Sequence, residues 1–437
     1  METCRHERPE SMETQMTGIR TQLLRYGTVQ NVMNLVNKQA LMDEHKKQRP
    51  RKAKGIDRVD KYAYGEKLNE NIDDLLERMK NLTYKPLPVR RTYIPKLNGK
   101  MRPLGIPAYE DRLVQGAIAC VLNSIYEPIF LNCSYGFRPH RSCHDAIRAI
   151  DTIVMRKNVN WVLEADIRGF FDHVNHDWLM KFLAHVIKDK RILRYIKRFL
   201  IAGIMEDGKF MESTEGTPQG GLISPILANV YLHYALDVWF KYAIKPQLKG
   251  EAYYVRYADD FVIFFQYEEE AREVMELLTT RLAKFSLEVA EEKTRILPFG
   301  PKAGTNESFD FLGFTIFNAK KRNGGYRIGF RTCKKKLKAK MQAAKEWIKG
   351  QMHGKLEEVL KALNLKYLGH CRYYGVNGNF KMIEKFRRFL CWTLLRALRR
   401  RGQKGKISWK RFGELWEKHI SRAEIMVDVW YSCPMNV

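Results

Sequence analysis

Residues 253–265 read YYVRYADDFVIFF, two apolar runs around a central pair of aspartates. Aromatic and β-branched side chains alternate on either side of this pair, a pattern typical of half-buried strands. Asp259 and Asp260 would then lie at the tip of a β-hairpin. Aspartate is common in turns because its side chain bonds the local backbone. Adjacent carboxylates among bulky apolar side chains are nevertheless costly without a cation, so the stretch indicates either turn chemistry or a magnesium site.

The composition favours a polyanionic partner. Lys and Arg number 77 against 49 Asp and Glu, a formal net charge of +28. The basic residues recur along the chain beside Tyr, Phe and Trp, which favours nucleic acid over a membrane surface. No apolar run approaches the ~20 residues of a spanning helix, and the first residues lack the apolar core of a signal peptide. The eight cysteines include no Cys-x-x-Cys pair, which favours free thiols in a reducing cytosol.

A third aspartate follows a second predicted strand. Residues 161–172 read WVLEADIRGFFD, a strand that runs into a turn with Asp166 at its C-terminal end. A strand end and a hairpin tip can meet in one sheet, so we expect Asp166 to join Asp259 and Asp260. Three carboxylates suit two divalent ions about 4 Å apart, an arrangement that serves phosphoryl transfer. No P-loop, Ser-His-Asp or Cys-His arrangement stands out.

Two further stretches carry cations suited to phosphates. Residues 90–107 predict a hairpin with an Asn-Gly turn, across which Lys96 and Arg102 would face each other as a triphosphate clamp. A plain exposed hairpin is the alternative. The loop of residues 134–142 places Arg138 and Arg141 beside Tyr and Phe, which suits contact with a nucleic-acid strand.

The remaining pattern predicts helices and short strands. Apolar spacing predicts helices over residues 66–82, 109–130, 143–154, 222–232 and 268–285. Asn175 is expected to cap a helix, with His173 and His176 packing at its entry. Strands are predicted at 293–297 and 309–316, where Gly313 would permit a close backbone approach. From about residue 330, basic helices follow, each with an apolar stripe and a cationic face.

In combination, these stretches resemble the reverse transcriptases. Residues 257–260 are similar to the signature hairpin of that family. The hairpin at 90–107, the loop at 135–139, the strand ending at Asp166, the loop at 217–221, Lys293 and residues 311–314 follow in the family's order. With residues 369–375 (GHCRYYG), the set resembles more narrowly the bacterial group II intron-encoded reverse transcriptases, or maturases. Residues 55–58 read GIDR, where that family often shows Gly-Ile-Asp-Gly.

The resemblance implies an α+β, right-hand polymerase. An N-terminal extension and fingers would occupy residues 1–165, with the palm beginning near residue 109. The palm would cover residues 166–325, and an α-helical thumb, or maturase domain, residues 326–400. A short basic DNA-binding-like segment would cover residues 401–437. The Cys pairs and His-Asn-His pattern of the endonuclease found in some relatives are absent, so we expect no second-strand nicking.

The resemblance also implies a role for each motif residue. Asp166, Asp259 and Asp260 would hold two Mg²⁺, with Mn²⁺ as a substitute and the carbonyl of Ile167 as a further ligand. Phe171 would exclude a ribose 2′-hydroxyl from the nucleotide site. The incoming dNTP would be bound by Lys96, Arg102, Gln219, Gly220 and Lys293. The primer grip would comprise Phe311, Leu312, Gly313 and Phe314.

The implied activity is RNA-directed DNA synthesis in the bacterial cytosol or nucleoid. A DNA or RNA primer would be extended with dNTPs on an RNA template, here group II intron RNA, whose splicing and mobility the protein would assist. One alternative is an intron-independent bacterial reverse transcriptase in a retroelement, defence or repair role. A non-catalytic splicing cofactor should have lost an acid, whereas all three are intact. A two-metal nuclease does not account for Gln219, Phe171 or the hairpin at 90–107.

Overall fold

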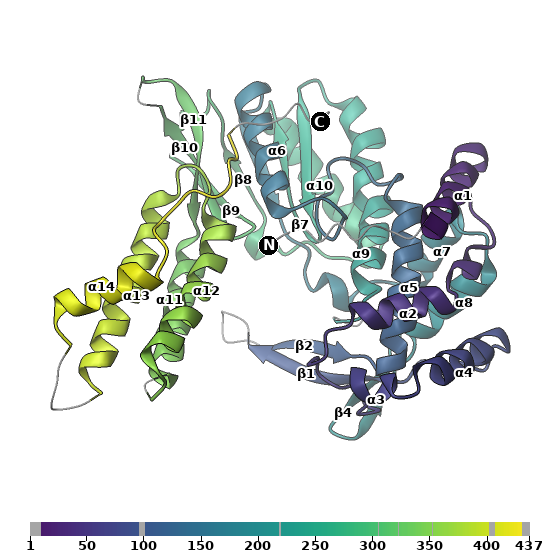
Figure 1. Cartoon of the computed structure of the whole chain (residues 1–437). Coiled ribbons are helices and arrows are strands. Elements are labelled where there is room, and N and C mark those ends of the chain that lie inside the picture. Colours follow the sequence, from purple (N-terminus) through teal and green to yellow (C-terminus); the bar gives the residue numbers. More distant parts are fainter. Residues whose placement is uncertain are drawn as a thin grey trace. The chain divides into compact units, whose positions relative to one another are not determined.

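The computed structural model describes residues 10–95, 101–217, 220–304, 306–321, 323–351, 353–401 and 407–430 (Figure 1). The chain forms two compact units, each built from three separate segments. The first unit comprises residues 1–141, 165–247 and 274–293. The second comprises residues 142–164, 248–273 and 294–437.

The first unit is mainly helical. Its helices are α1 (Glu10–Tyr26), α2 (Lys38–Lys47), α3 (Lys61–Gly65), α4 (Leu68–Lys80), α5 (Tyr109–Tyr126), α7 (His176–Val186), α8 (Lys190–Leu200) and α9 (Ser224–Leu232). Its short 3-10 or π segments are η1 (Val32–Leu35), η2 (Phe170–Asp172), η3 (His233–Asp237), η4 (Phe240–Ile244), η5 (Lys245–Gln247) and η6 (Glu291–Lys293). One four-stranded sheet has the order β2-β1-β4-β5, formed by β1 (Val89–Pro95), β2 (Met101–Ile106), β4 (Ile204–Glu206) and β5 (Lys209–Met211).

Helix α5 forms the centre of the first unit. It is buried around most of its circumference, and α1, α2 and α9 pack against it. The predicted helix at 109–130 is thereby confirmed, as is the helix at 66–82, which appears as α4 with Ile72, Leu75 and Met79 buried. Asn175 caps α7 by accepting a hydrogen bond from the Trp178 N–H at 3.0 Å. These elements are specified by local spacing and caps, which the sequence displays directly.

The second unit contains two sheets and a helical C-terminal part. One sheet has the order β6-β7-β3-β8 and the other β11-β10-β9. The strands are β3 (Trp161–Ala165), β6 (Ala252–Tyr257), β7 (Asp260–Phe265), β8 (Arg295–Pro298), β9 (Ser308–Phe311), β10 (Phe314–Lys320) and β11 (Tyr326–Thr332). The helices are α6 (Cys143–Arg156), α11 (Lys334–Gly350), α12 (Leu356–Tyr374), α13 (Phe380–Arg399) and α14 (Trp409–His419). Helix α6 packs on β6 and β11, and the division between the units falls within α10 (Glu268–Lys284).

The hairpin of β6 and β7 is confirmed, but its strands are more buried than predicted. Residues 261–265 of β7 are all buried, and in β6 only Tyr253 and Tyr257 are half-buried. The alternation of side-chain types in the sequence therefore does not predict which residues of the two strands are buried. A continuous apolar run such as FVIFF is typical of a strand covered on both faces.

The predicted single strand at 309–316 is wrong, because a tight turn divides it. Phe311 and Phe314 are partners in the register of β9 and β10, so Leu312 and Gly313 form the turn between them. Their φ angles are +50° and +80°. Positive φ at both central residues is typical of the type I′ hairpin turn. The strand predicted at 293–297 begins later, since β8 starts at Arg295 and Lys293 ends η6.

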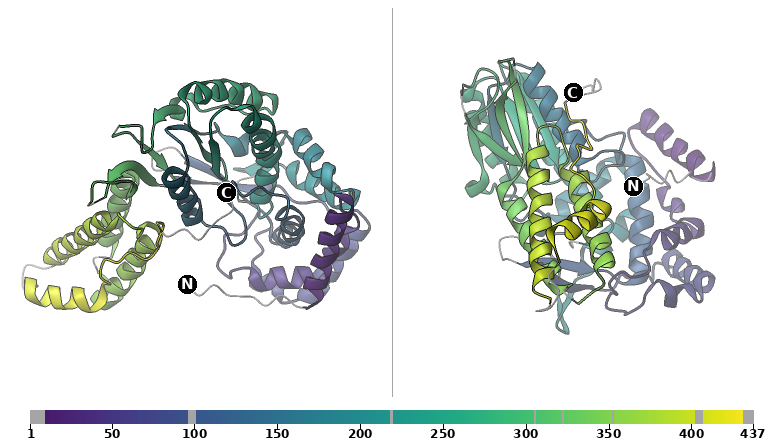
Figure 2. Two further views of the ribbon diagram at one scale, coloured as in Figure 1. Left: turned by 90° about the horizontal axis from the view of Figure 1, so that it is seen from above. Right: turned by 60° about the vertical axis from the view of Figure 1, so that its left-hand side comes forward.

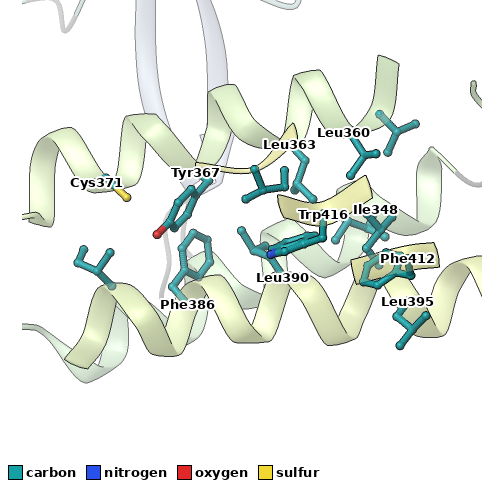
Figure 3. Close-up of a cluster of buried hydrophobic side chains, with 14 of the residues drawn as sticks. Ile348, Leu360, Leu363, Tyr367, Cys371, Phe386, Leu390, Leu395, Phe412 and Trp416 are labelled. Atoms are coloured by element: carbon teal, nitrogen blue, oxygen red, sulfur yellow. The ribbon is translucent and has the colours of Figure 1, made fainter. Parts of the chain in front are cut away.

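The four C-terminal helices share one hydrophobic core, and they lie side by side in Figure 1 and Figure 2. Figure 3 shows Tyr367 of α12 and Phe386 of α13 pointing toward each other, with Trp416 of α14 in the same cluster. The basic helices predicted after residue 330 are thus confirmed, and those on both sides of residue 400 pack together. The domain limits at 165, 325 and 400 stay predictions. No helix within the described ranges is long and apolar enough to cross a membrane.

His370, near the C-terminal end of α12, is fully buried among aromatic rings. Its ring centroid lies 4.4 Å from that of Phe386 and 4.9 Å from that of Tyr374. Neither ring nitrogen has a hydrogen-bond partner in the described part of the chain. Burial, together with the nearby Lys340 ammonium, lowers the pKa of His370 from 6.5 to about 3. The imidazole is therefore neutral in the folded protein at neutral pH.

Replacing His370 by Phe is expected to make the fold less sensitive to acid. The folded-state pKa lies below the unfolded value, so the unfolded chain takes up the proton first as the pH falls. The contribution of His370 to the free energy of unfolding is therefore fully present above pH 6.5. It is lost as the pH falls from 6.5 toward 3, by up to about 1.4 kcal/mol per pH unit. Urea unfolding followed by tryptophan fluorescence between pH 7 and about 4.5 measures this. A wild-type dependence of stability on pH in His370→Phe would contradict the expectation.

Candidate active site

Asp166 lies one residue beyond Ala165, the last residue of β3. Its carboxylate is mostly buried and forms an ion pair with the Lys293 ammonium. The Ala290 N–H donates to the Asp166 carbonyl at 2.8 Å, and the Arg168 N–H donates to the Glu288 carbonyl at 2.9 Å. These bonds hold residues 166–168 antiparallel to residues 288–290. Lys293 therefore reaches Asp166 from a backbone that is itself fixed to the Asp166 segment.

The carbonyl of Ile167 is oriented by the same pairing. Ile167 and Val289 form an antiparallel bridge, and the flanking hydrogen bonds are made by their neighbours. In such a non-hydrogen-bonded pair the two residues turn their own N–H and C=O groups away from each other. The Ile167 carbonyl is thus directed away from residues 288–290. This orientation is compatible with the predicted role as a ligand.

Asp259 and Asp260 lie at a tightly fixed hairpin tip in the second unit. Tyr257 pairs with Asp260, so Ala258 and Asp259 form a two-residue turn. Ala258 has a φ of +58°, in the left-handed region that costs a non-glycine residue about 1 kcal/mol. The fully buried Arg256 donates from Nη1 to the Ala258 carbonyl at 3.0 Å. Local strain that the surroundings hold in place is common at functional sites.

The order of the sheet brings β3 beside β7. The Asn160 N–H, just before β3, donates to the carbonyl of Phe265 at the end of β7, at 2.8 Å. The two strands therefore run antiparallel, and the C-terminal end of β3 lies toward the beginning of β7. Asp166 follows the former end and Asp260 opens the latter. This is the sheet order that the predicted meeting of strand end and hairpin tip requires.

The donor groups fit a hard divalent cation. Among the described residues, no three His, Cys, Asp or Glu side chains are grouped closely enough to hold a metal ion. One of the predicted ligands, the Asp166 carboxylate, is already paired with a positive charge, the Lys293 ammonium. Carboxylates and a carbonyl oxygen are the ligands that Mg²⁺ prefers. Asp166, Asp259, Asp260 and Ile167 together supply only such oxygens.

Phe171 lies in η2, directly after the Asp166 segment, and is half-buried. The Thr217 N–H donates to its carbonyl at 2.8 Å, and its ring packs edge-to-face on Phe170 with centroids 5.2 Å apart. His176 contacts the Gly216 carbonyl through Nε2 at 2.7 Å, which confirms that it packs at the entry of α7. Phe171 is therefore held by its backbone and by Phe170 while the residue stays partly exposed, which is compatible with the predicted steric gate.

Gly220 lies in close contact with the protein's own strand β2. Its φ is +120°, and a Cβ built on it would lie 2.6 Å from the Gly105 carbonyl oxygen. The Leu222 N–H donates to Gln115 Oε1 at 2.9 Å and fixes the loop further. A cavity of about 460 Å³ adjoins this contact and is lined in part by Arg90, Arg112, Gly105 and Gly220. Gln219 lies outside the described residues.

The predicted cationic residues have different surroundings. The register of β1 and β2 places Arg102 opposite Ile94. The predicted pairing of Arg102 with Lys96 stays a prediction. Lys96 itself lies outside the described residues. Arg102 is exposed, as a nucleotide-binding cation must be.

Arg138 has an internal role in this structure. Its guanidinium is buried and makes five hydrogen bonds, two to the carboxylate of Glu127 at 2.8 and 3.0 Å and three to the backbone carbonyls of Glu127, Leu131 and Ser134. An arginine has five N–H donors, so all are satisfied within the protein. We therefore do not retain Arg138 as an RNA contact. Arg141 is partly exposed and also donates to Asn132 and Ser134.

The turn predicted as the primer grip is braced by two tyrosines at the end of α12. The Tyr373 hydroxyl donates to the Leu312 carbonyl at 2.8 Å, and its ring stacks on Phe314 with centroids 5.8 Å apart. A Cβ on Gly313 would lie 2.8 Å from the Tyr374 hydroxyl oxygen. In the sequence these tyrosines stand out only as part of the motif at residues 369–375, which does not reveal that they brace the turn. The only signal was their position directly before Gly375.

Comparison with known proteins agrees with this architecture. The family model described as reverse transcriptase (RNA-dependent DNA polymerase) matches residues 94–316, just over half of the chain. The group II intron-encoded protein LtrA of Lactococcus lactis subsp. cremoris is 30% identical over 415 residues, covering 75% of this chain and 67% of that protein. Protein YkfC of Escherichia coli strain K12 is 35% identical over 310 residues, covering 63% and 78%. Nuclear intron maturase 1 of Arabidopsis thaliana is 34% identical over 97 residues, covering 22% and 13%.

The chain belongs to the reverse transcriptase family, and it is an RNA-directed DNA polymerase. The similarity to LtrA and the intron maturases places it among the group II intron-encoded reverse transcriptases. Its helices, mostly antiparallel sheets and helical C-terminal part confirm the predicted α+β class and are consistent with a right-hand polymerase.

Proposed function

We propose that this chain copies group II intron RNA into DNA at a centre formed by Asp166, Asp259 and Asp260, and that it also binds the intron RNA to assist splicing and mobility. The observation that carries the proposal is the sheet order, in which the end of β3 before Asp166 lies toward the Asp260 end of β7. The names of the similar proteins support the association with introns.

In this proposal the three carboxylates and the Ile167 carbonyl hold two Mg²⁺. When bound, such ions activate the primer 3′-hydroxyl and stabilise the leaving pyrophosphate. The Lys293 ammonium leaves the Asp166 carboxylate that it now neutralises, because that carboxylate is needed as a metal ligand. The ammonium is then available for the triphosphate or for proton donation to the leaving group. The 3′ oxygen forms a bond to the α-phosphorus while the bond from that phosphorus to pyrophosphate breaks.

Contacts within each unit suit substrate positioning. The exposed Arg102, and Gly220 with the cavity beside it, support nucleotide binding. The family resemblance assigns the same role to Lys96 and Gln219. The turn of residues 311–314 would hold the primer, since Tyr373 and Tyr374 leave it little freedom. Arg141 remains a candidate contact to the template.

Replacing Phe171 by Ala is expected to relax the choice between dNTPs and rNTPs. Removing the ring opens space where the ribose 2′-hydroxyl would lie, and the preference for dCTP over CTP should fall roughly 10- to 100-fold. Single-nucleotide incorporation at saturating template measures the two efficiencies. Phe171→Tyr, which keeps the ring, should retain the wild-type preference. An unchanged ratio in Phe171→Ala would remove this residue from the gate.

Primer extension with dNTPs and Mg²⁺ on a group II intron RNA template tests the proposal as a whole. The full chain should make full-length DNA and should bind the intron RNA more tightly than a size-matched, unrelated structured RNA. DNA synthesis with equal affinity for both RNAs would refute the intron association and favour an intron-independent reverse transcriptase. Failure to extend any RNA-templated primer would refute the assigned site.

A further inference from the structure

Two tryptophans on the C-terminal helices are exposed and stacked on each other. Trp392 of α13 and Trp409 of α14 are each 51% exposed. Their ring centroids lie 5.0 Å apart and the ring planes differ by 23°. The core-facing side of α13 carries Ile383, Phe386 and Leu390, which are buried in the shared cluster. The tryptophan pair is therefore an apolar aromatic surface outside that core, open to solvent.

Cations flank the pair along one face of α13. The exposed residues recur every three or four positions: Lys381, Lys385, Arg388, Trp392, Arg396 and Arg399. Residues at this spacing lie on one side of a helix. With a rise of 1.5 Å per residue, the nearest cations lie about 6 Å from Trp392 along the axis on either side. One of them, Arg388, is also paired with Glu384 at 3.3 Å.

This combination fits a single nucleic-acid strand better than other partners. Aromatic rings stack on unpaired bases of any sequence, and cations beside them contact the backbone. A paired base offers no open face to such rings. A membrane-binding helix would instead present a broad apolar face. Here the aromatic surface is one pair of rings bounded by charge along α13.

We propose that Trp392 and Trp409 form a stacking platform for an unpaired base of RNA, with the α13 cations holding the adjacent phosphates. The inference rests on the proposed RNA-binding function and names a contact for it in the C-terminal helices. The site lies within the second unit and involves none of the predicted polymerase residues.

Binding of the full chain to three fluorescein-labelled probes tests the platform. The probes are a twelve-nucleotide uridine RNA, its deoxythymidine counterpart and a twelve-base-pair RNA duplex, without dNTPs or Mg²⁺. In the double variant Trp392→Ala, Trp409→Ala, affinity for the uridine RNA should fall about tenfold. Its affinity for the RNA duplex should stay within about twofold of the wild-type value. The salt dependence of binding should not change, because no cation is lost.

Arg396→Ala should instead lower the logarithmic salt slope by about 0.7 on the single strand. An equal loss for deoxythymidine would make the platform general for single strands, and a smaller loss would favour RNA.

Two controls keep the result decisive. Leu365→Ala removes an apolar side chain on α12 that is 71% exposed, and it should bind all probes like the wild type. Ultraviolet crosslinking of a bromouridine RNA to the wild-type chain should label the peptide of Trp392 or Trp409, which needs no variant to fold. Equal losses on strand and duplex, crosslinks only elsewhere, or self-association that the double variant abolishes would each overturn the platform. Because the assay needs no synthesis, failure of DNA synthesis alone would refute the polymerase site and leave this result intact.

Discussion

Replacing Asp259 by Asn is expected to reduce RNA-templated primer extension by at least about 1000-fold. The side chain keeps its shape but loses the charge that compensates a divalent cation. The hairpin tip should survive, because Asn also tolerates turns and the Ala258 carbonyl remains bonded to Arg256. Single-turnover extension of a labelled primer in Mg²⁺ measures the loss.

Affinity for the RNA–primer duplex should stay within about twofold in the same variant, because phosphate contacts by the many cations dominate nucleic-acid binding. The matched control is Asp73→Asn, which makes the same charge change at an exposed ion pair with Lys38. It should extend primers at the wild-type rate. Near-normal extension by Asp259→Asn would contradict the site assignment, and loss of RNA binding would mean that Asp259 has a structural role instead.

Replacing Gly220 by Ala is expected to displace the loop that follows residue 217 from strand β2. The new Cβ would lie 2.6 Å from the Gly105 carbonyl oxygen, and the φ of +120° is unfavourable for any side chain. A backbone oxygen on a paired strand cannot move aside as a flexible side chain can. We expect the efficiency of dNTP incorporation to fall roughly 100-fold, since small misplacements at a reaction centre have effects of this size.

Gly208→Ala separates the effect of backbone strain from the effect of a steric clash. Gly208 has a φ of +79° but no atom within 4 Å of its built Cβ, so the substitution adds backbone strain without a clash. It should lower stability by about 1 kcal/mol and leave nucleotide incorporation nearly unchanged. If Gly220→Ala incorporates dNTPs as well as Gly208→Ala does, the packing of the loop on β2 does not matter for synthesis.

Local patterns made much of this fold predictable. The β6–β7 hairpin, the capped start of α7 and the amphipathic α4 are each specified by residues within one short window. The turn at Leu312 escaped prediction because leucine at positive φ carries none of the usual Gly, Asn or Asp signal at that position. Strand β7 is buried more completely than alternation suggests, because burial depends on what covers each face.

The candidate site was predictable as a set of side chains but not as a set of contacts. Asp166 stands out as an acid at a strand end, whereas its partner Lys293 comes from 127 positions further along the chain. Arg138 resembles a nucleic-acid contact in sequence, yet its guanidinium is paired with the Glu127 carboxylate inside the first unit. The stacking of Trp392 on Trp409 depends on how α13 packs against α14, which no local pattern displays.

Cleavage by bound iron tests most directly whether Asp166 and the Asp259–Asp260 tip hold the same ions. Fe²⁺ can replace Mg²⁺ among oxygen ligands, and with ascorbate and peroxide it cuts the nearby backbone. The wild-type chain should be cut near residue 166 and near residues 259–260, with both cuts suppressed by excess Mg²⁺ and lost in Asp259→Asn. A cut at only one of the two segments, or cuts that persist in Asp259→Asn, would contradict a shared metal centre.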